Sequence, residues 1–536
     1  MKRWIAPLVL FCLATLCMIA VPSHYAKKVE AVCPTCPPPP PPPPTTGQFG
    51  GPLAGLNKTM TNLFNGGYGN FVVKWDPIRG LGPVSTKTGC FTCHGSGTDV
   101  LTGTAGDTSN VTGTRYGRWN ADNTFNYLDG SGSEPEDEGG PIIHGTSNAA
   151  FGTLPGCNQM KIAAQSSSGA VESGTTVTIT TTTAHGFKKG QTVQVLGVGV
   201  SGYNGQFSIV SVPSTTTFTY TASSSGLASS GGGTAQNLPH EVIPSDATVV
   251  STVRSPQLFG FGLIDNISDS DILANAAATK KFGVTGIANM IEDENGVVRP
   301  ARFGQKLGEV TLFQFNADAE FNELGITTSN SLFGVASAFN PTEHNPQGLS
   351  FPTSCQPDTN GPQDPLQVNM IKMTQFISLL APIPPQPPTS QTSAGEAVFN
   401  STGCNQCHVQ SYTTKQSVTL KTTNGGQSAV VPQLSNVTFS PYSDFLLHDM
   451  GSGDSGGIPF LPHGVGAASL TMWRTSPLWG LSNVITKSGG LMHDNGSTSI
   501  DAAIKRHGGE AATVVGNYKA LSKTDSTNLL AFLNSL

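Results

Sequence analysis

Two Cys-x-x-Cys-His motifs constrain this chain more than any other feature of its sequence. They comprise Cys90, Cys93 and His94, and Cys404, Cys407 and His408. Two cysteines one helical turn apart can form thioethers with the vinyl groups of a haem, and the next histidine then lies under the iron as its proximal ligand. With ten cysteines and eleven histidines in 536 residues, chance gives roughly 0.004 such motifs. We therefore expect two covalently bound haem c groups.

A zinc site or a pair of disulfides does not explain the histidine that follows each pair. Cys33 and Cys36 lack that histidine, and a disulfide or an unstructured tether is their simplest interpretation. Cys157 and Cys355 are also best interpreted as a disulfide.

The N-terminus has the pattern of a secretory signal. Lys2 and Arg3 precede an apolar stretch from Trp4 to Val21. Because His24 makes a poor cleavage site, residues 1–26 are interpreted as a signal peptide or a retained membrane anchor. Residues 27–50 contain an unbroken proline run and predict a stiff tether. We expect a periplasmic or extracellular protein, with a membrane tether through this segment left open.

Composition and charge restrict the partners. Charged residues make up 12% of the chain, with 63 glycines and 38 prolines, so a loop-rich structure is expected. The net charge of −6 is spread over the chain without a long basic run. Neither nucleic acid nor an anionic membrane surface is favoured as a partner.

One segment has a different pattern from its surroundings. Residues 166–235 are rich in Thr, Ser, Val and Gly, and apolar residues alternate with polar ones. This period of two predicts strands, so we expect a small all-β module inserted in the first haem lobe. The rest is predicted to be mainly α with extensive loops, in two cytochrome-c-like lobes: an N-terminal haem lobe at 51–388 and a C-terminal cytochrome c domain at 389–536.

A short internal repeat suggests that the two lobes share a plan. Residues 254–260 (RSPQLFG) recur loosely as residues 474–480 (RTSPLWG). Each copy lies downstream of one haem motif.

Several segments resemble one known family, the di-haem oxidoreductases related to bacterial di-haem cytochrome c peroxidases, which are also described as thiol oxidoreductases. The resemblance covers most of residues 80–536 outside the β insertion. It depends on residues 255–260, 265–267, 302–304, 324–327, 447–451, 474–480 and 493–510.

The resemblance implies ligands for the second haem. In the peroxidase relatives, a His-Asp-Gly turn is followed fourteen residues later by a ligating methionine, and here His493 is followed at that spacing by His507. Bis-histidine ligation by His408 and His507 is therefore implied, with a lower potential than a His/Met haem. His448 and Met450 are rival ligands, and His448 could instead hydrogen-bond to a propionate or a carbonyl.

The first iron has no sixth ligand by the same comparison, because Ala278 takes the place that His507 has in the second lobe. An open iron would suit a peroxidatic or small-substrate site, whereas His144 could cap it. The resemblance also implies that Glu323 moves protons during peroxide cleavage; a solvated helix carboxylate is the alternative. It further places Arg254 and Arg474 on haem propionates, and leaves open a calcium ion between the lobes.

These observations predict an exported di-haem oxidoreductase. Electrons are expected to enter at the C-terminal haem and to reduce peroxide or another small substrate at the N-terminal haem. The expected partners are a cytochrome or cupredoxin-type redox protein and a small oxidant. The alternative is a non-catalytic electron-transfer protein docked to a redox partner. Thiol oxidation or reduction is a third interpretation, without separate support in the sequence.

Overall fold

The structure is a computed structural model, and it describes residues 42–75, 80–82, 84–96, 104–109, 112–121, 125–126, 128, 146–147, 159–236, 243–328, 364, 368–422, 427–451 and 471–536. The predicted signal or anchor, His144, and the cysteines at 33, 36, 157 and 355 lie outside these residues. Within the described ranges, no helix has both the length and the apolar character that crossing a bilayer requires.

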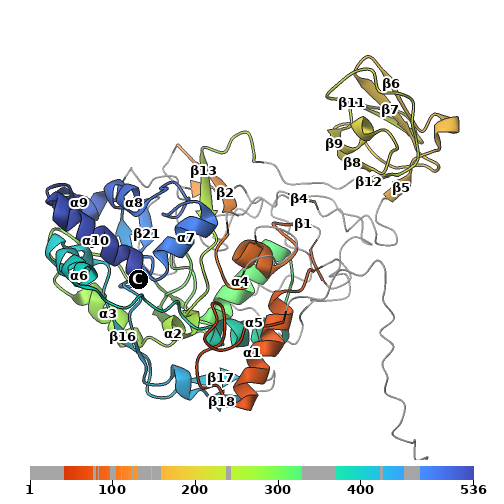
Figure 1. Cartoon of the computed structure of the whole chain (residues 1–536). Helices are drawn as coiled ribbons and strands as arrows, with labels where there is room; N and C mark the ends of the chain where they lie inside the picture. The colour runs from red at the N-terminus through yellow and green to blue at the C-terminus, as the bar shows by residue number, and fades with distance from the viewer. Residues whose placement is uncertain are drawn as a thin grey trace, which may run out of the picture. The chain divides into compact units, whose positions relative to one another are not determined.

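The helices form two main pairs that are distant in sequence, α1 against α5 and α6 against α10 (Figure 1). The helices are α1 (Lys58–Phe71), α2 (Phe261–Asp265), α3 (Asp269–Ala277), α4 (Leu312–Leu324), α5 (Val368–Leu379), α6 (Ser390–Thr402), α7 (Leu481–Ser488), α8 (Ile500–Arg506), α9 (Ala512–Lys519) and α10 (Lys523–Ser535).

Two helices position candidate site residues, and local signals fix their ends. A capping box of Thr311 and Gln314 begins α4, which carries Glu323, and Thr389 with Thr392 begins α6 in the same way. Helix α6 ends at Gly403, whose φ of 104° suits glycine. A Cβ there would lie 2.6 Å from the Phe282 ring, so the close packing also requires glycine. The second haem motif begins at the next residue.

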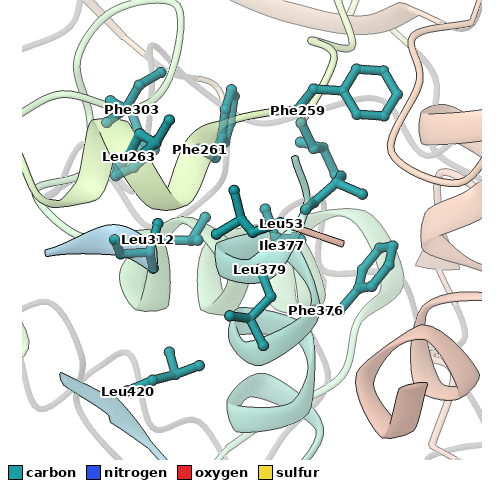
Figure 2. Packing of buried hydrophobic residues seen from close by; sticks show 14 of the residues in the cluster. Leu53, Phe259, Phe261, Leu263, Phe303, Leu312, Phe376, Ile377, Leu379 and Leu420 are labelled. Atoms are coloured by element: carbon teal, nitrogen blue, oxygen red, sulfur yellow. The ribbon is translucent and has the colours of Figure 1, made fainter. Parts of the chain in front are cut away.

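The largest apolar core joins segments from both sides of the predicted lobe boundary at residue 388 (Figure 2). Phe376 and Leu379 of α5 pack with Phe259, inside the first repeat copy, and with Phe261, directly after it. Leu420 and Trp479 come from the C-terminal part of the chain. This shared core holds the first repeat copy close to the second haem motif.

Outside the β-rich insertion the strands are short and antiparallel. They pair as β1 (Val84–Ser85) with β4 (Thr146–Ser147), β2 (Thr112–Trp119) with β13 (Val249–Arg254) and β3 (Phe125–Asn126), β14 (Met290–Glu292) with β15 (Val298–Pro300), β16 (Tyr412–Thr413) with β19 (Thr438–Phe439), β17 (Thr419–Lys421) with β18 (Ser428–Val430), and β20 (Leu447–Asp449) with β21 (Met472–Arg474). Strands β13 and β21 end at Arg254 and Arg474, the first residues of the two repeat copies.

The prediction of a mainly α fold with two cytochrome-c-like lobes is wrong. Many small antiparallel sheets accompany the helices, and an all-β module occupies part of the N-terminal half. Strands of two or three residues have no measurable period, and their hydrogen-bond partners are often far away in sequence. The sequence therefore suggested loops where the chain forms strand pairs.

The all-β module spans residues 159–236 and has its own core. One sheet has the order β10-β11-β7-β6 and the other the order β5-β12-β8-β9. Their bounds are β5 (Gln159–Lys161), β6 (Ala170–Ser173), β7 (Thr176–Thr180), β8 (Thr192–Leu196), β9 (Gly205–Ser208), β10 (Ser211–Ser214), β11 (Thr217–Thr221) and β12 (Thr234–Gln236). Alternate residues such as Val177, Ile179, Val193 and Val195 are fully buried in this core. The module begins before the predicted residue 166, because β5 pairs with β12 at its far end.

Candidate functional site

The first motif forms a tight turn that orients His94. Cys90 precedes a π-type turn at Thr92–Ser96. His94 Nδ1 donates a hydrogen bond to the Pro256 carbonyl over 2.8 Å, which leaves Nε2 as the nitrogen that can bind iron. Burial lowers the pKa of His94 to about 4, although the Pro256 hydrogen bond opposes this effect. The imidazole is therefore neutral at physiological pH, as a metal ligand must be.

A short loop at residues 104–109 holds the backbone of this motif. Gly106 N–H donates to the His94 carbonyl at 2.8 Å, and the Ser109 hydroxyl donates to the Cys93 carbonyl at 2.9 Å. The Thr108 hydroxyl donates to the Ser255 carbonyl at 2.7 Å. The loop thereby connects the motif to the first repeat copy.

The second motif repeats the same arrangement with a different partner. His408 Nδ1 donates to the Tyr442 carbonyl at 2.8 Å. Burial, with a smaller contribution from the His507 charge, lowers the pKa of His408 to about 4, although the Tyr442 hydrogen bond opposes this effect. His408 is therefore also neutral, with Nε2 left for iron. The residues of both motifs fit the proximal side of a haem.

A mainly apolar cavity opens beside His408. It is bounded by residues from both repeat copies, from the second motif and from helices α7 to α9. The wall includes Arg254, Pro256, Gln257, Phe261, Phe399, Cys404, Cys407, His408, His448, Met450, Trp473, Arg474, Leu478, Trp479, Val484, Met492, His493, Ala503, His507, Val514, Val515 and Tyr518. An apolar wall with a few convergent polar groups is typical of a cofactor pocket.

His507 lies in this cavity wall, at the end of α8. Its Nδ1 donates to the Ala503 carbonyl at 2.7 Å, one helical turn earlier. This bond directs Nε2 away from the helix backbone. His507 is close enough to His408 for its charge to affect the His408 pKa. The structure thus brings together the two histidines implied by the resemblance.

Both ring nitrogens of His448 have carboxylate partners, which favours His507 over His448 as the iron ligand. Its Nε2 lies 2.9 Å from Asp444 Oδ2 and its Nδ1 lies 3.0 Å from Glu510 Oε2. Burial alone would lower the pKa of His448, but hydrogen bonds to Asp444, Cys407 and Glu510 raise it to about 11. An imidazolium with both nitrogens protonated has no lone pair for iron. Met450 also lines the cavity and stays a rival to His507.

Cys407, Asp444 and His448 form the one cluster of three potential metal-ligand side chains found in the described ranges. A thiol, an imidazole and one carboxylate do not match the oxygen-rich set that calcium prefers. The calcium ion stays a prediction.

Arg254 and Arg474 lie on the same cavity wall. Burial and the nearby Arg474 charge lower the pKa of Arg254 to about 10. Arg254 Nε donates to the Met492 carbonyl at 3.3 Å, and Arg474 Nη1 donates to the Arg302 carbonyl at 3.1 Å. Two neighbouring buried guanidiniums repel each other unless an anion lies between them. The two propionates of a haem would supply such anions.

The first site contains a carboxyl group that the sequence did not single out. Glu323, the predicted proton-transfer residue, is half-buried, and its charge raises the pKa of Cys93. Glu320 is one turn earlier on α4 and only 4% exposed. Burial and the Asp364 charge raise its pKa well above the usual range, and its charge in turn raises the pKa of Cys90. Its Oε1 has no hydrogen-bond partner within the described ranges. The position of Glu320 on the same face of α4 as the buried Phe313 and Ala317 is the sequence signal that could have identified this carboxyl group.

The first site differs from the second in its histidines. The pKa of His94 responds to burial and the Pro256 carbonyl, and no second histidine among the described residues contributes. Ala278 lies exposed at the end of α3. The open first iron stays a prediction, because its possible cap, His144, lies outside the described residues.

The motif cysteines are poorly suited to thiol exchange. Burial and the Glu323 charge raise the pKa of Cys93 to about 12, and burial raises that of Cys404 to about 12. Thiols that stay protonated at neutral pH are weak nucleophiles.

Comparison with solved structures finds two distant similarities. Hydrazine synthase of Kuenenia stuttgartiensis, pressurised with xenon, is 13% identical over 53% of this chain and 73% of its own, with a TM-score of 0.25. A MauG-like protein associated with microbial copper homeostasis is 16% identical over 52% of this chain and 86% of its own, with a TM-score of 0.20. Neither score is high enough to inform the fold or the activity.

No curated protein matches the chain. A family model does match, over residues 233–536, and is described as "Di-haem oxidoreductase, putative peroxidase". The match covers more than half of the chain and includes the second haem motif, both repeat copies and His507. The family resemblance inferred from the sequence is confirmed. The chain belongs to the di-haem oxidoreductase family.

Proposed function

We propose that this di-haem oxidoreductase carries two covalently attached c-type haems and reduces peroxide or a similar small oxidant. The observation that carries the proposal is the matched pair of neutral histidines, His94 and His408, each with Nδ1 bonded to a carbonyl. Cys90 and Cys93 would form the thioethers at the first site, and Cys404 and Cys407 those at the second. When bound, the haems supply the one-electron chemistry.

The second site would hold a six-coordinate haem and receive electrons. His408 and His507 line one cavity with their Nδ1 atoms fixed by carbonyls, so both Nε2 atoms suit axial ligation. Arg254 and Arg474 would bind the propionates. A bis-histidine haem has a lower potential than a His/Met haem.

The first site would be the place of reduction. Reducing a peroxide to two waters consumes two electrons and two protons, so a group that moves protons is needed beside the iron. Glu320 supports this role because it is buried, burial raises its pKa well above the usual range, and its charge affects the pKa of Cys90. Glu323 is the second candidate, closer to Cys93.

Non-catalytic electron transfer is the second candidate function. The β module at 159–236 has its own apolar core, and its described histidine, His185, is 2% exposed within that core. A module with this composition suits docking to a partner better than redox chemistry. Two six-coordinate irons would favour this alternative.

Export, the tether and a cytochrome or cupredoxin-type donor belong to the same proposal and rest on the sequence. The lobe boundary at 388/389 also stays a prediction. Thiol chemistry ranks below both candidates, since burial raises the pKa of Cys93 and of Cys404.

The test uses the full chain produced in a host that matures c-type cytochromes. The haem content of the denatured, washed protein should be two per chain. The ferric spectrum should contain one low-spin and one high-spin haem, and cyanide should convert the latter. Peroxide should then oxidise a reduced cytochrome in the presence of the protein. Two low-spin haems without such turnover would refute the peroxidase proposal in favour of electron transfer.

A further inference from the structure

Residues 254–257 touch both haem-binding sites within four consecutive positions. On the second side, Arg254 N–H donates to the His493 carbonyl at 2.6 Å, and Gln257 Nε2 donates to the Trp479 carbonyl at 2.5 Å. Arg254, Pro256 and Gln257 all line the cavity beside His408. We call residues 254–257 the strap.

On the first side, the strap holds the proximal ligand itself. The Pro256 carbonyl accepts the His94 Nδ1–H at 2.8 Å. The Ser255 carbonyl accepts the Thr108 hydroxyl at 2.7 Å, and the Ser255 side chain hydrogen-bonds to Cys93. The wall of the second cavity is therefore one hydrogen bond away from the imidazole that would bind the first iron.

We propose that the strap is the electron-transfer link between the two sites, with the Pro256 carbonyl as its central atom. The inference rests on the proposed function, because it needs a haem at each site. With haems held by His408 and His94, the strap would carry one electron from the reduced second haem to the oxidised first haem. No bond forms or breaks, and no proton leaves the strap. The strap joins the two sites through contiguous covalent bonds and through hydrogen bonds of 2.8 Å or less.

The packing of the strap explains why it can hold this position. Gln257 is 8% exposed, and Leu258 N–H donates to the Gly106 carbonyl at 2.7 Å, so both ends are fixed. The two repeat copies meet here, since Gln257 of the first bonds to Trp479 of the second. The repeat thus acts as a joint between the sites.

The experiment loosens the strap from each side separately. Thr108→Val removes the hydroxyl that holds Ser255, and Gln257→Leu removes the bond to Trp479, while neither residue is an iron ligand. Asn483→Ala is the matched control. It removes the hydrogen bond from Asn483 Nδ2 to Asp107 Oδ1 at 2.7 Å, which joins the loop at residues 104–109 to the C-terminal part of the chain without involving the strap. Thr108→Ser keeps the hydroxyl and should restore the wild-type rate.

Electron redistribution between the haems is followed optically after a reducing pulse on the ferric protein and, separately, after an oxidising pulse on the ferrous protein. In one of the two experiments, the pulse first reacts with the haem from which the added electron or electron vacancy must then move to the other haem. We expect Thr108→Val and Gln257→Leu to slow the exchange by about tenfold, the lower end of the loss caused by removing hydrogen-bond partners around a metal site. Asn483→Ala should stay close to the wild-type rate.

Two failures are distinguishable. Haem content is measured first, and a single haem per chain would overturn the proposed function and the link together. Two haems with wild-type exchange in both strap variants, or with equal slowing in Asn483→Ala, would overturn the link alone. The reduction potentials of both haems, measured in each variant, separate a slower path from a smaller driving force.

Discussion

Asp444→Asn should destabilise this protein far more than loss of an exposed ion pair. Asp444 is fully buried, His448 is 2% exposed, and their side chains lie 2.9 Å apart. Lys280, at 5% exposure, also contacts Asp444 Oδ2. The substitution leaves two buried cations with Glu510 as the remaining carboxylate in contact with His448.

The magnitude follows from removing one partner of a buried pair, which costs about 3–5 kcal/mol. The pH dependence has a definite sign. His448 has its pKa raised from 6.5 to about 11, so its contribution is fully present below pH 6.5 and is lost as the pH rises through 11. The Asp444 pKa is lowered, because the His448 hydrogen bond outweighs burial, and its contribution is present above about pH 4 and lost on further acidification. The deficit should therefore be largest between about pH 4 and 6.5 and should shrink toward pH 11.

Chemical denaturation of the holoprotein, followed by far-ultraviolet circular dichroism at several pH values, measures this difference. The matched control is Asp246→Asn, because Asp246 forms an ion pair with Arg118 in which both side chains are at least 33% exposed. Exposed pairs contribute about 0–1 kcal/mol. If Asp444→Asn costs no more than Asp246→Asn at pH 6, the buried charge cluster does not exist as described.

Three further predictions concern the two sites. His507→Met should raise the reduction potential of the second haem, because a thioether replaces an imidazole. Potentiometric titration measures the change, with Lys505→Met as the control. An unchanged potential would exclude His507 as a ligand. Glu320→Gln should lower peroxide turnover by about 10²-fold or more without changing haem content, whereas a larger loss in Glu323→Gln would assign the proton transfer to Glu323 instead. Gly403→Ala should destabilise the protein by about 1–3 kcal/mol, because Gly403 has a positive φ and lies against Phe282. The control Gly516→Ala in α9 has open space around it and should stabilise the protein by about 0.5–1 kcal/mol. Similar unfolding midpoints for the two variants would contradict the close packing at Gly403.

The sequence by itself determined the features that depend on local spacing. The two Cys-x-x-Cys-His motifs and the alternating strands of the β module are patterns within short segments. The fourteen-residue step from His493 to His507 had a meaning only through the family resemblance. The family resemblance depended on the same local patterns, and the family match confirms it.

Only the tertiary structure decided which groups meet. Pro256 and Tyr442 accept the proximal histidine hydrogen bonds from 162 and 34 residues away. Asp444 and Glu510 raise the pKa of His448, and burial raises that of Glu320, whose charge affects Cys90. The mainly α prediction failed for the same reason: two-residue strands pair through distant backbone groups. Burial and long-range hydrogen bonds set these properties, and neither is encoded in the spacing of neighbouring residues.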